Sequence, residues 1–510
     1  MKSLACLPCL LASLALAGFA SADGPAATAE AGKTIGWRGD GTGVYPNATP
    51  PTEWYKKENG ESKNILWETK LPCYSWATPI IVGDRVIVRS EPYDLICLNK
   101  LTGKILWIRS HPPFIAVTPE EKQANPAFKE IEALVAELEK VNAAFVKKGW
   151  TKELYATKYG LQKKIDELTT KADAKYELPR DMYVESWSGY TGSTPCSDGA
   201  FIYLISGCGI TACYDLDGNR KWARFESQVD IWGEHGSACS PALVGDKLLT
   251  SAVAVTALDK ATGREIWRSR KGAGSYSILS FRAGGVDYAI ANGEFLRVSD
   301  GKSVFSAGGG MVTRHENLVC ITSSWAGFYR WEAAENGELK VTTLVKDEYE
   351  KMLLPFGDPA KRWEPMFNFY TASPLYHDGL VYCLGNWGRL VVLDATKTSI
   401  KDGLVYTSFV PFDFRNPQGR KSTGMGVGAS PALAGNRIYM IDSANCTVVM
   451  APGREYRQIA KNTIDYTVGE GWEPKHWMGP HHEQTEASLA FDGPRIYIRA
   501  EQFLYCIGAE

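Results

Sequence analysis

The sequence predicts an all-β fold, an eight-bladed β-propeller of four-stranded antiparallel blades, with a seven-bladed ring as the alternative. Two observations predict it. A short hairpin pattern recurs along the chain, and most copies are followed by a strand, a tight turn and a Trp. Four short strands in each unit of about 40 to 50 residues are typical of a propeller blade. One segment lacks this pattern and predicts an inserted α-helical hairpin.

The first half of each unit is a small residue, Ser or Thr, often Pro, and then alternating apolar residues. It reads ATPIIVGDRVIV from Ala77, CSPALVGDKLLT from Cys239 and ASPALAGNRIYMI from Ala429. Gly-Asp, Asp-Gly or Gly-Asn between two apolar runs is a β-hairpin signal. We expect eight units, which start near Ala77, Ser193, Cys239, Tyr276, Gly310, Ala372, Ala429 and Ala487.

The second half of each unit is a strand, a turn and an aromatic residue. It ends at Trp107, Trp222 and Trp267 and, in a degenerate copy, at Phe305. Asp or Asn begins the turn, and Gly takes the position that requires a positive φ. We expect each Trp to fill the gap between neighbouring sheets.

The two ends of the repeat region predict how the ring closes. A spare strand, residues 64–71 (NILWETKL), precedes the first unit, whereas the last unit ends at residues 504–508 without a fourth strand. We expect residues 64–71 to complete the last blade, because this pairing also removes an exposed sheet edge. The propeller is therefore predicted to span residues 64–510, with residues 23–63 as an N-terminal extension.

Residues 118–175 carry helical rather than strand periodicity and lie between the first two blades. Thr118 to Glu121 form a predicted capping box with Pro119 at the first helical position. Apolar residues then recur at helical spacing from Phe128 to Phe145, and a second helix is predicted after Gly149. This hairpin is either a docking arm for a partner or a decoration packed on the propeller.

The N-terminus predicts export. Residues 1–22 have a Lys, an apolar run and a small-residue cleavage pattern, Ala20-Ser21-Ala22, which are typical of a signal peptide. No Cys lies near the predicted cleavage point, so we expect no lipid anchor. No other apolar run is long enough to predict a transmembrane segment. The mature protein is expected to be soluble, in the periplasm or secreted.

The net charge argues against a nucleic-acid-binding protein, and the cysteines leave two possibilities open. The chain has 56 basic and 58 acidic residues, a formal net charge of −2. Nucleic-acid binding requires a basic face, and none is visible. Of the twelve cysteines, Cys6 and Cys9 lie in the predicted signal peptide. Cys208 and Cys213 are either a disulfide across a tight strand pair or buried free thiols.

The Ser-Pro opening, the Ala-Leu-Asp…Thr-Gly…Trp ending and the Trp-bearing strand before the first unit resemble the PQQ-like, or quinoprotein-like, β-propeller repeat family. The resemblance extends from about Trp37 to the C-terminus, apart from the helical insertion. Its opening, WRGDGTGVYPN, is most similar in character to exported propellers of this family without an assigned role. The family also includes quinoprotein alcohol dehydrogenases and a non-enzymatic lipoprotein of the bacterial outer-membrane assembly machine.

Three patterns of those relatives are absent from the sequence. Quinoprotein dehydrogenases typically carry adjacent bonded cysteines beside the cofactor, and this chain has no Cys-Cys dipeptide. Its only Cys-x-x-Cys, Cys6 to Cys9, lacks the His of a haem site and lies in the predicted signal peptide. The lipidated Cys of the assembly lipoprotein is also missing.

The connectors before the Ser-Pro openings are expected to meet at a central funnel. They and a hairpin of the sixth blade supply aromatic and polar side chains, and Arg314 and His315 lie near the fifth opening. The candidate ligand- or cofactor-binding residues are Trp76, Trp187, Glu234, His235, Asn386 and Trp387. Aromatic walls with a few polar groups are typical of a ligand site. The alternative is that these residues pack between blades and seal the axis.

A second candidate site is a cluster near the last blade, which comprises His476, His481, His482 and Glu483. Imidazole and carboxylate ligands suit zinc or copper. The Gly479-Pro480 break gives no regular ligand spacing, and no Cys accompanies the cluster.

From these observations we expect an exported binding or scaffold protein, non-catalytic, that takes a protein partner or a small ligand at the funnel. No catalytic set is recognisable, and no catalytic residue is assigned. The alternative is a PQQ-dependent alcohol or sugar dehydrogenase. PQQ would need a divalent cation such as Ca²⁺ to polarise its carbonyls, and Glu234 and Asn386 are the nominated ligands.

Overall fold

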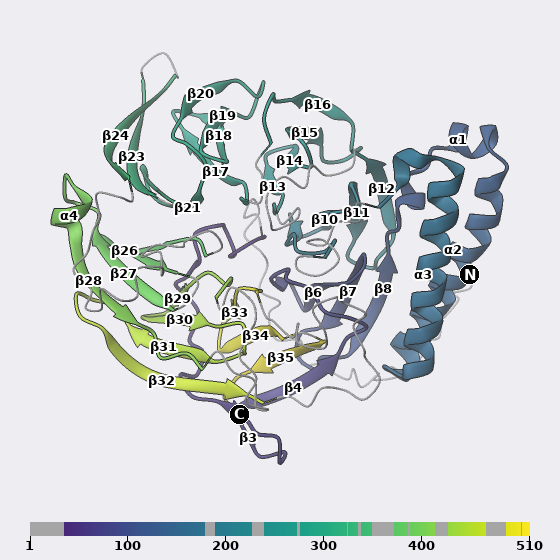
Figure 1. The fold of residues 1–510 in the computed structure, drawn as a ribbon, viewed down its shortest axis with the longest axis horizontal. Coiled ribbons are helices and arrows are strands. Elements are labelled where there is room, and N and C mark those ends of the chain that lie inside the picture. Colours follow the sequence, from purple (N-terminus) through teal and green to yellow (C-terminus); the bar gives the residue numbers. More distant parts are fainter. Residues whose placement is uncertain are drawn as a thin grey trace, which may run out of the picture.

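The computed structural model describes residues 35–178, 189–226, 239–272, 276–323, 325–334, 338–348, 372–385, 388–413, 427–465, 486–500 and 502–509. Within these residues the strands form eight sheets arranged around an axis (Figure 1). Each sheet is built on four antiparallel strands in meander order, one of them with three further short strands at its edges, and neighbouring sheets pack face to face. The structure is an all-β propeller with eight blades, and the predicted fold class is confirmed.

The first four blades have one strand each at the axis, two in the middle and one at the rim. Blade 1 comprises β5 (Ile80–Val82), β6 (Arg85–Ser90), β7 (Asp94–Asn99) and β8 (Ile105–Ser110). Blade 2 comprises β9 (Cys196–Ser197), β10 (Phe201–Ile205), β11 (Ile210–Asp215) and β12 (Arg220–Phe225). Blade 3 comprises β13 (Ala242–Val244), β14 (Lys247–Ser251), β15 (Val255–Asp259) and β16 (Glu265–Arg268). Blade 4 comprises β17 (Leu279–Ala283), β18 (Val286–Ala291), β19 (Glu294–Arg297) and β20 (Ser303–Ser306).

The other four blades follow the same order. Blade 5 comprises β21 (Met311–His315), β22 (Leu318–Thr322), β23 (Trp325–Ala333) and β24 (Leu339–Glu348). Blade 6 comprises β25 (Leu375–His377), β26 (Leu380–Leu384), β27 (Arg389–Asp394) and β28 (Leu404–Phe409), with the short helix α4 (Ile400–Gly403) before β28. Blade 7 comprises β29 (Ala432–Ala434), β30 (Arg437–Ile441), β31 (Thr447–Ala451) and β32 (Arg457–Ile464).

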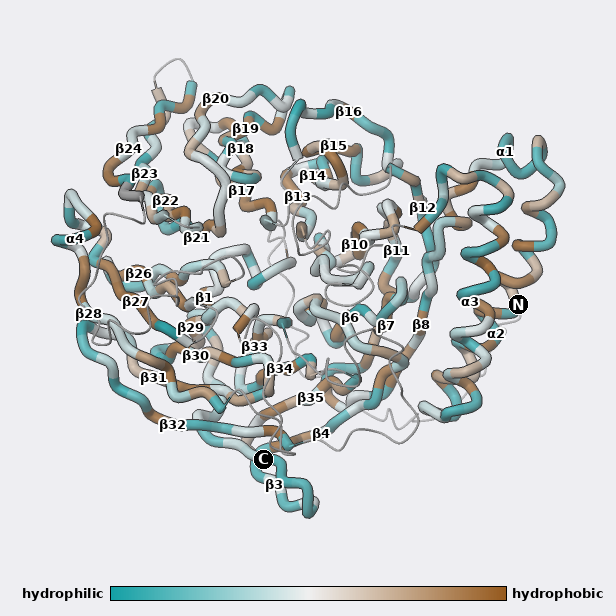
Figure 2. Tube along the Cα trace, in the orientation of Figure 1, coloured by the Kyte–Doolittle hydropathy of each residue, from teal (hydrophilic) through white to brown (hydrophobic). Residues whose placement is uncertain are grey.

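Blade 8 combines the two ends of the chain. Its first three strands are β33 (Ala490–Asp492), β34 (Arg495–Ala500) and β35 (Phe503–Ile507), and its fourth is β4 (Ile65–Lys70), which pairs antiparallel with β35. Three short strands extend blade 7: β1 (Val44–Tyr45) beside β29, and β2 (Tyr55–Lys56) with β3 (Ser62–Lys63) beside β32. Figure 2 shows that the hairpin at β3, which projects from the ring, is largely hydrophilic.

The Ser or Thr that opens a unit links neighbouring blades. Its hydroxyl oxygen accepts the backbone N–H of the corresponding residue in the preceding blade. These bonds run from Thr78 to Thr194 (3.0 Å), from Thr194 to Ser240 (3.1 Å), from Ser240 to Ser277 (3.3 Å), from Ser373 to Ser430 (2.9 Å), from Ser430 to Ser488 (3.0 Å) and from Ser488 to Thr78 (3.1 Å). Blade 5 has Gly308 to Gly310 at its opening and no hydroxyl there. The recurring Ser-Pro motif is therefore a ring of inter-blade hydrogen bonds.

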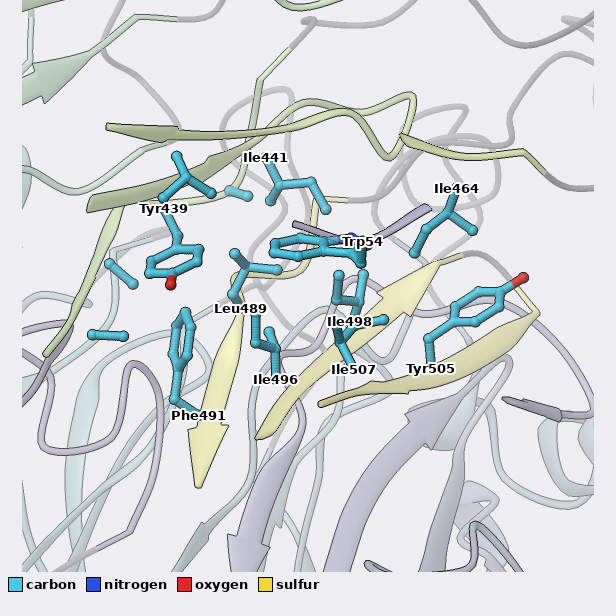
Figure 3. Packing of buried hydrophobic residues seen from close by; sticks show 14 of the residues in the cluster. Trp54, Tyr439, Ile441, Ile464, Leu489, Phe491, Ile496, Ile498, Tyr505 and Ile507 are labelled. Atoms are coloured by element: carbon cyan, nitrogen blue, oxygen red, sulfur yellow. The ribbon is translucent and has the colours of Figure 1, made fainter. Parts of the chain in front are cut away.

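Buried apolar side chains fill the spaces between blades. Between blades 7 and 8, Trp54 is 2% exposed and stacks on Tyr439 at 6.3 Å between ring centroids. Figure 3 shows Trp54 among the isoleucines of β34 and β35 and the side chains of blade 7. Trp54 therefore anchors the N-terminal extension in the core between the blade that closes the ring and its neighbour.

The helical insertion comprises η1 (Pro113–Ala116), α1 (Pro119–Ala124), α2 (Ala127–Lys148), α3 (Lys152–Ala172) and η2 (Ala174–Tyr176). The capping box is present: Thr118 accepts from the Glu121 N–H, and Glu121 accepts from the Thr118 N–H. α2 lies along β8 at the rim of blade 1 (Figure 1). The apolar face of α2 joins the core of blade 1 through Val141 and Phe145.

A buried ion pair also fixes the insertion to blade 1. Lys158 of α3 places its Nζ 3.1 Å from Asp94 Oδ2, and the two side chains are 2% and 0% exposed. Ser110 donates its hydroxyl to the other oxygen of Asp94 at 2.6 Å. The hairpin is thus packed on the propeller along its length and is not a free-standing arm.

The described cysteines are free and buried. Cys208 packs in the core between blades 1 and 2, whereas Cys213 packs in a different cluster with Tyr203 and Leu248. Because the two side chains lie on different faces of the blade 2 sheet, the proposed disulfide is wrong and the buried-thiol alternative holds. Among the described residues, no helix is both long and apolar enough to cross a bilayer.

Candidate functional site

We call the face on which the inner strands of the blades begin the entry face. Trp76 is half-buried there, in the connector that leads into β5. The other predicted site residues lie outside the described residues: Trp187, Glu234, His235, Asn386, Trp387, His476, His481, His482 and Glu483. Their proposed roles in ligand, cofactor or metal binding therefore stay predictions.

The placement of Arg314 and His315 near the fifth opening is wrong. The two residues end the inner strand β21 (Met311–His315) and so lie at the opposite end of that strand from the entry face. Arg314 Nε donates to Ser280 O in blade 4 at 3.2 Å, and the His315 ring stacks on Tyr376 of blade 6 at 4.3 Å. These contacts connect blades 4, 5 and 6.

A segment of the chain itself lies at the axis. We call residues 35–48 the axial segment. Ile35 and Ser197 of β9 exchange two backbone hydrogen bonds of 2.9 and 2.7 Å, and further along Leu433 N of blade 7 donates to Gly43 O at 2.8 Å. Because β9 and β29 are the innermost strands of their blades, the segment runs along their axial edges, and its purple trace crosses the centre of the ring in Figure 1.

Arg38 fixes the axial segment between two blades. Its side chain is 1% exposed and donates to the carbonyl oxygens of Pro374 in blade 6 (3.1 Å) and Pro431 in blade 7 (3.0 Å). Burial lowers the pKa of Arg38 to about 10, so the guanidinium stays charged at neutral pH. A Cβ at Gly43, whose φ is +78°, would lie 2.4 Å from Arg38 Nη2. Glycine is therefore required beside the guanidinium.

Arg38 is not among the residues that the sequence predicts at the axis. The one available signal was the spacing of glycines at residues 39, 41 and 43, which predicts close backbone approach but no partner. The structure supplies the partners: Gly41 faces Leu279 of blade 4, and Arg38 faces two prolines that follow the Ser of Ser-Pro openings.

A buried carboxyl joins two connectors of the entry face. Glu91 is 8% exposed and follows β6. It accepts the N–H groups of Tyr190 (2.9 Å) and Thr191 (2.8 Å) and the Thr191 hydroxyl. Thr191 Oγ1 and Ser75 Oγ lie 3.0 Å apart, so the connector into blade 1 is bonded to the connector into blade 2. We call Ser75, Glu91, Tyr190 and Thr191 the Glu91 cluster.

Burial raises the pKa of Glu91 to about 7, although its hydrogen bonds from Thr191 and Tyr190 oppose the shift. A carboxyl with this pKa exchanges its proton near neutral pH. Tyr74 lies beside the cluster: burial raises its pKa well above the ordinary value, and the charge of Glu91 adds to the shift. Tyr74 is therefore a neutral phenol at physiological pH.

A second polar group lies deeper between blades 1 and 2. Arg89, which is fully buried, donates to Ser193 O at 3.2 Å and to Ser206 Oγ at 2.6 Å. Its guanidinium lies 3.0 Å from His111 Nε2. Burial and the charge of Arg89 hold the pKa of His111 well below its usual range, so the imidazole is neutral and accepts from Arg89. This group connects the two blades below the Glu91 cluster.

The part of the chain that the structure describes contains no group of three His, Cys, Asp or Glu residues able to hold a metal ion. Glu234 and Asn386, the nominated ligands of a quinone-bound cation, are outside it. We therefore derive no step through a quinone.

A protein-family model described as outer membrane protein assembly factor BamB, PQQ_2, matches residues 57–160 and 251–455. No curated protein matches the chain. Among solved structures, BamB from Moraxella catarrhalis is 12% identical, with 61% of this chain and 82% of that chain covered and a TM-score of 0.41.

Two further solved structures are similar. The quinohemoprotein alcohol dehydrogenase ADHIIG from Pseudomonas putida HK5 is 11% identical, with 91% of this chain and 78% of that chain covered and a TM-score of 0.45. The computationally designed Ika8 protein is 10% identical, with 88% and 100% covered and a TM-score of 0.42. At these identities the likenesses say nothing of ligand or activity. The family model, however, matches more than half of the residues, and this chain belongs to the PQQ-like β-propeller family.

Proposed function

We propose that this protein is an exported, non-catalytic propeller that binds a protein partner or an extended ligand on its entry face. The observation that carries the proposal is the axial segment. Arg38 and the backbone of residues 35–45 bond to blades 2, 6 and 7 at the axis. Because the chain itself lies along the axial edges of the inner strands, we place the binding of a partner on the connectors that surround the axis at the entry face.

The Glu91 cluster supports a binding role over a catalytic one. A general base must place a lone pair within hydrogen-bond reach of the substrate. Both oxygens of Glu91 instead accept from the connector into blade 2, and the side chain is 8% exposed. The cluster therefore holds two connectors in a fixed relation, which favours binding of a partner to a preformed surface.

Export is part of the proposal and rests on the pattern of residues 1–22, which lie outside the described residues. The family description, an outer membrane protein assembly factor, supports a partner-binding role outside the cytoplasm. The proposal does not extend to the particular partner of that factor.

Photo-crosslinking tests the binding surface. Trp76 is replaced by benzoylphenylalanine in the full-length protein, and Phe409, an exposed residue at the rim of blade 6, is replaced in a control. Crosslinking to a discrete species in envelope extracts from position 76, and not from position 409, is expected. Equal labelling from both positions, or none from position 76, would contradict binding on the entry face.

Titration with PQQ and calcium tests the alternative, a quinoprotein dehydrogenase. We expect no saturable quenching of Trp fluorescence. Saturable quenching that is lost in Glu234→Ala and Trp187→Ala, together with dye reduction by an alcohol, would establish the dehydrogenase and end the non-catalytic proposal.

A further inference from the structure

An amine, a carboxamide and a carboxyl are buried together where the helical insertion packs on blade 1. Lys158 of α3 is 2% exposed, Asn142 of α2 is 1% exposed and Asp94 of β7 is 0% exposed. Figure 1 shows α2 and α3 side by side next to β8. Lys158 Nζ donates to Asn142 Oδ1 and lies 3.1 Å from Asp94 Oδ2. The lysine nitrogen therefore contacts the amide of one helix and the carboxyl of the sheet at the same time.

The Ser110 hydroxyl connects these three groups. Ser110 Oγ accepts from Lys158 Nζ at 3.1 Å and from Asn142 Nδ2 at 3.0 Å, and it donates to Asp94 Oδ1 at 2.6 Å. Asp94 and Ser110 are direct partners in the pairing of β7 with β8, so the sheet fixes the carboxyl and the hydroxyl relative to each other. The hydroxyl thus bridges the carboxyl and the amide nitrogen. We call Asp94, Ser110, Asn142 and Lys158 the amide cluster.

The surroundings of Asp94 favour transfer of a proton from the lysine. Burial raises the pKa of Asp94, although the charge of Lys158 and the hydrogen bonds from Ser110 and Lys158 oppose the shift. Asp94 is therefore a better proton acceptor than an exposed aspartate. Transfer of one proton from Lys158 to Asp94 also removes two charges from a buried site, where charges are costly. The neutral amine that results has the lone pair that a nucleophile needs.

We propose that Lys158 and Asn142 form an isopeptide bond, which links α3 to α2 covalently. Asp94 takes one proton from the Lys158 ammonium, and the freed lone pair attacks Cγ of Asn142. Asp94 passes this proton through the Ser110 hydroxyl to Asn142 Nδ2, which leaves as ammonia when its bond to Cγ breaks. The second proton that Lys158 Nζ loses goes to the departing ammonia. One amide replaces another, an ammonium ion is released, Asp94 returns to its carboxylate, and no oxidant is consumed.

The burial of the amide cluster favours this reaction over hydrolysis of the Asn142 amide. Hydrolysis needs water at Cγ, and the four residues of the amide cluster are at most 6% exposed. The helices and the sheet hold the amine against the amide, which replaces the encounter of two free groups. The bond would be a permanent link in a protein whose described cysteines are free thiols. The inference does not depend on the proposed function, because it concerns how the insertion is held together.

The wild-type protein provides the first test. The intact mass of purified full-length protein, measured under denaturing conditions, should be about 17 Da below the mass of its sequence, the loss of one ammonia. Trypsin should release a branched peptide in which residues 141–147 are joined to residues 153–163, because trypsin does not cleave after a modified Lys158. An unmodified mass, a loss elsewhere in the chain, or Lys158 joined to Asp94 with loss of water would overturn the proposal.

Variants test the role of each group. Lys158→Arg keeps the positive charge beside Asp94 but has no amine, so it should give no branched peptide. Asp94→Asn keeps the volume and removes the proton acceptor, and it should slow the reaction about a hundredfold. Ser110→Ala should slow it less, because it removes only the relay. Lys164→Arg is the matched control in the same helix, because Lys164 is exposed and lies 3.7 Å from Glu130.

The branched peptide is measured against time after purification, and circular dichroism shows whether each variant is folded. The control should give the branched peptide in the wild-type amount. Equal amounts of branched peptide in Asp94→Asn and the wild type at the earliest time would contradict the proposed role of the carboxyl. The wild-type mass decides whether the bond exists, even where a variant does not fold.

Discussion

Two groups of blade boundaries differ in the contact made by the rim strand. The first group comprises the four boundaries from blade 8 through blades 1, 2 and 3 to blade 4. The second comprises the boundaries from blade 4 to blade 7. In the first group, the rim strand of each blade carries a Trp whose indole N–H donates to a backbone carbonyl of the next blade. The bonds are Trp67 to Lys100 (3.2 Å), Trp107 to Leu216 (2.9 Å), Trp222 to Lys260 (3.0 Å) and Trp267 to Val298 (2.8 Å). Each ring also lies against the turn glycine of the next blade.

In the second group, contacts that are not repeated stand in place of the Trp hydrogen bond. Phe305 replaces the Trp in blade 4 and packs edge-on against Tyr329 of blade 5 at 5.8 Å. Between blades 6 and 7, Gly453 N donates to Tyr382 Oη at 2.8 Å, and Arg38 bonds to both blades from the axis. At the rim, an intact repeat contacts the next blade through the same Trp each time, whereas a degenerate repeat is joined to its neighbour by residues particular to that boundary.

The largest expected change in the free energy of unfolding comes from removing the aromatic side chain at one boundary of each group. Trp107→Ala removes a 7% exposed ring and its hydrogen bond, and we expect it to lower the free energy of unfolding by about 4 kcal/mol. Phe305→Ala removes a half-buried ring without a polar contact and should cost about 2 kcal/mol. Urea denaturation followed by circular dichroism measures both. Equal costs would mean that the Trp contact adds nothing to the boundary.

The pH dependence of the free energy of unfolding tests the contact that the Glu91 carboxyl makes between blades 1 and 2. Glu91 has a pKa of about 7 in the folded protein, against an ordinary 4.5. The folded state therefore holds a proton that the unfolded state releases between these pH values. The stabilisation is complete below pH 4.5 and is lost as the pH rises through 7, by up to about 3 kcal/mol.

Glu91→Gln cannot titrate, so the difference in stability between wild type and variant should change with pH. Measured by urea denaturation, the wild type should lose stability relative to Glu91→Gln as the pH rises from 4.5 to 7. A constant difference over this range would show that the Glu91 carboxyl is already ionised at low pH in the folded protein.

The boundary between blades 6 and 7 is tested at Arg38. Arg38→Met keeps most of the apolar volume but leaves the carbonyls of Pro374 and Pro431 without this donor, at a cost of about 2 kcal/mol. Hydrogen exchange should become faster in β25 and β29 and stay unchanged in β13. Arg437→Met is the control, because Arg437 of the same blade donates to its sequence neighbour Asn436 and, among the described residues, to no other blade. Exchange that rises equally in all blades would show a global rather than a local role.

The repeats could be predicted from the sequence because the residues that define each unit lie close together in the chain. The Thr-Gly turn and the following Trp recur at fixed spacing, and so do the Ser and Pro of each opening. Arg38 has no such neighbour: its partner Pro374 lies 336 residues away, and nothing in a single sequence pairs them. Glu91 and Thr191 are likewise 100 residues apart.

The helical insertion also has a contact that could not be predicted from the sequence. Its helical period was visible, and its packing face could be derived from the apolar residues. Lys158, however, is a charged residue in a lysine-rich stretch, and its burial against Asp94 depends on how the hairpin lies along β8. Of the candidate funnel residues, only Trp76 is among the described residues, where it is half-buried. Its role in ligand binding stays a prediction.

The smallest expected change in the free energy of unfolding separates the packing of Trp107 against Gly218 from the backbone cost of replacing a glycine. Gly218 has a φ of +79°, and a Cβ there would lie 2.7 Å from the Trp107 ring. Gly245 has a φ of +61° in another blade, and nothing lies within 4 Å of its Cβ position. Both alanine substitutions carry the cost of a left-handed backbone, about 1 kcal/mol. Gly218→Ala should cost about 1 kcal/mol more, because the rigid indole must move from its place between two blades. In the background of Trp107→Ala this excess should vanish, and an excess that persists there would show that Gly218 acts through its own turn and not through the ring.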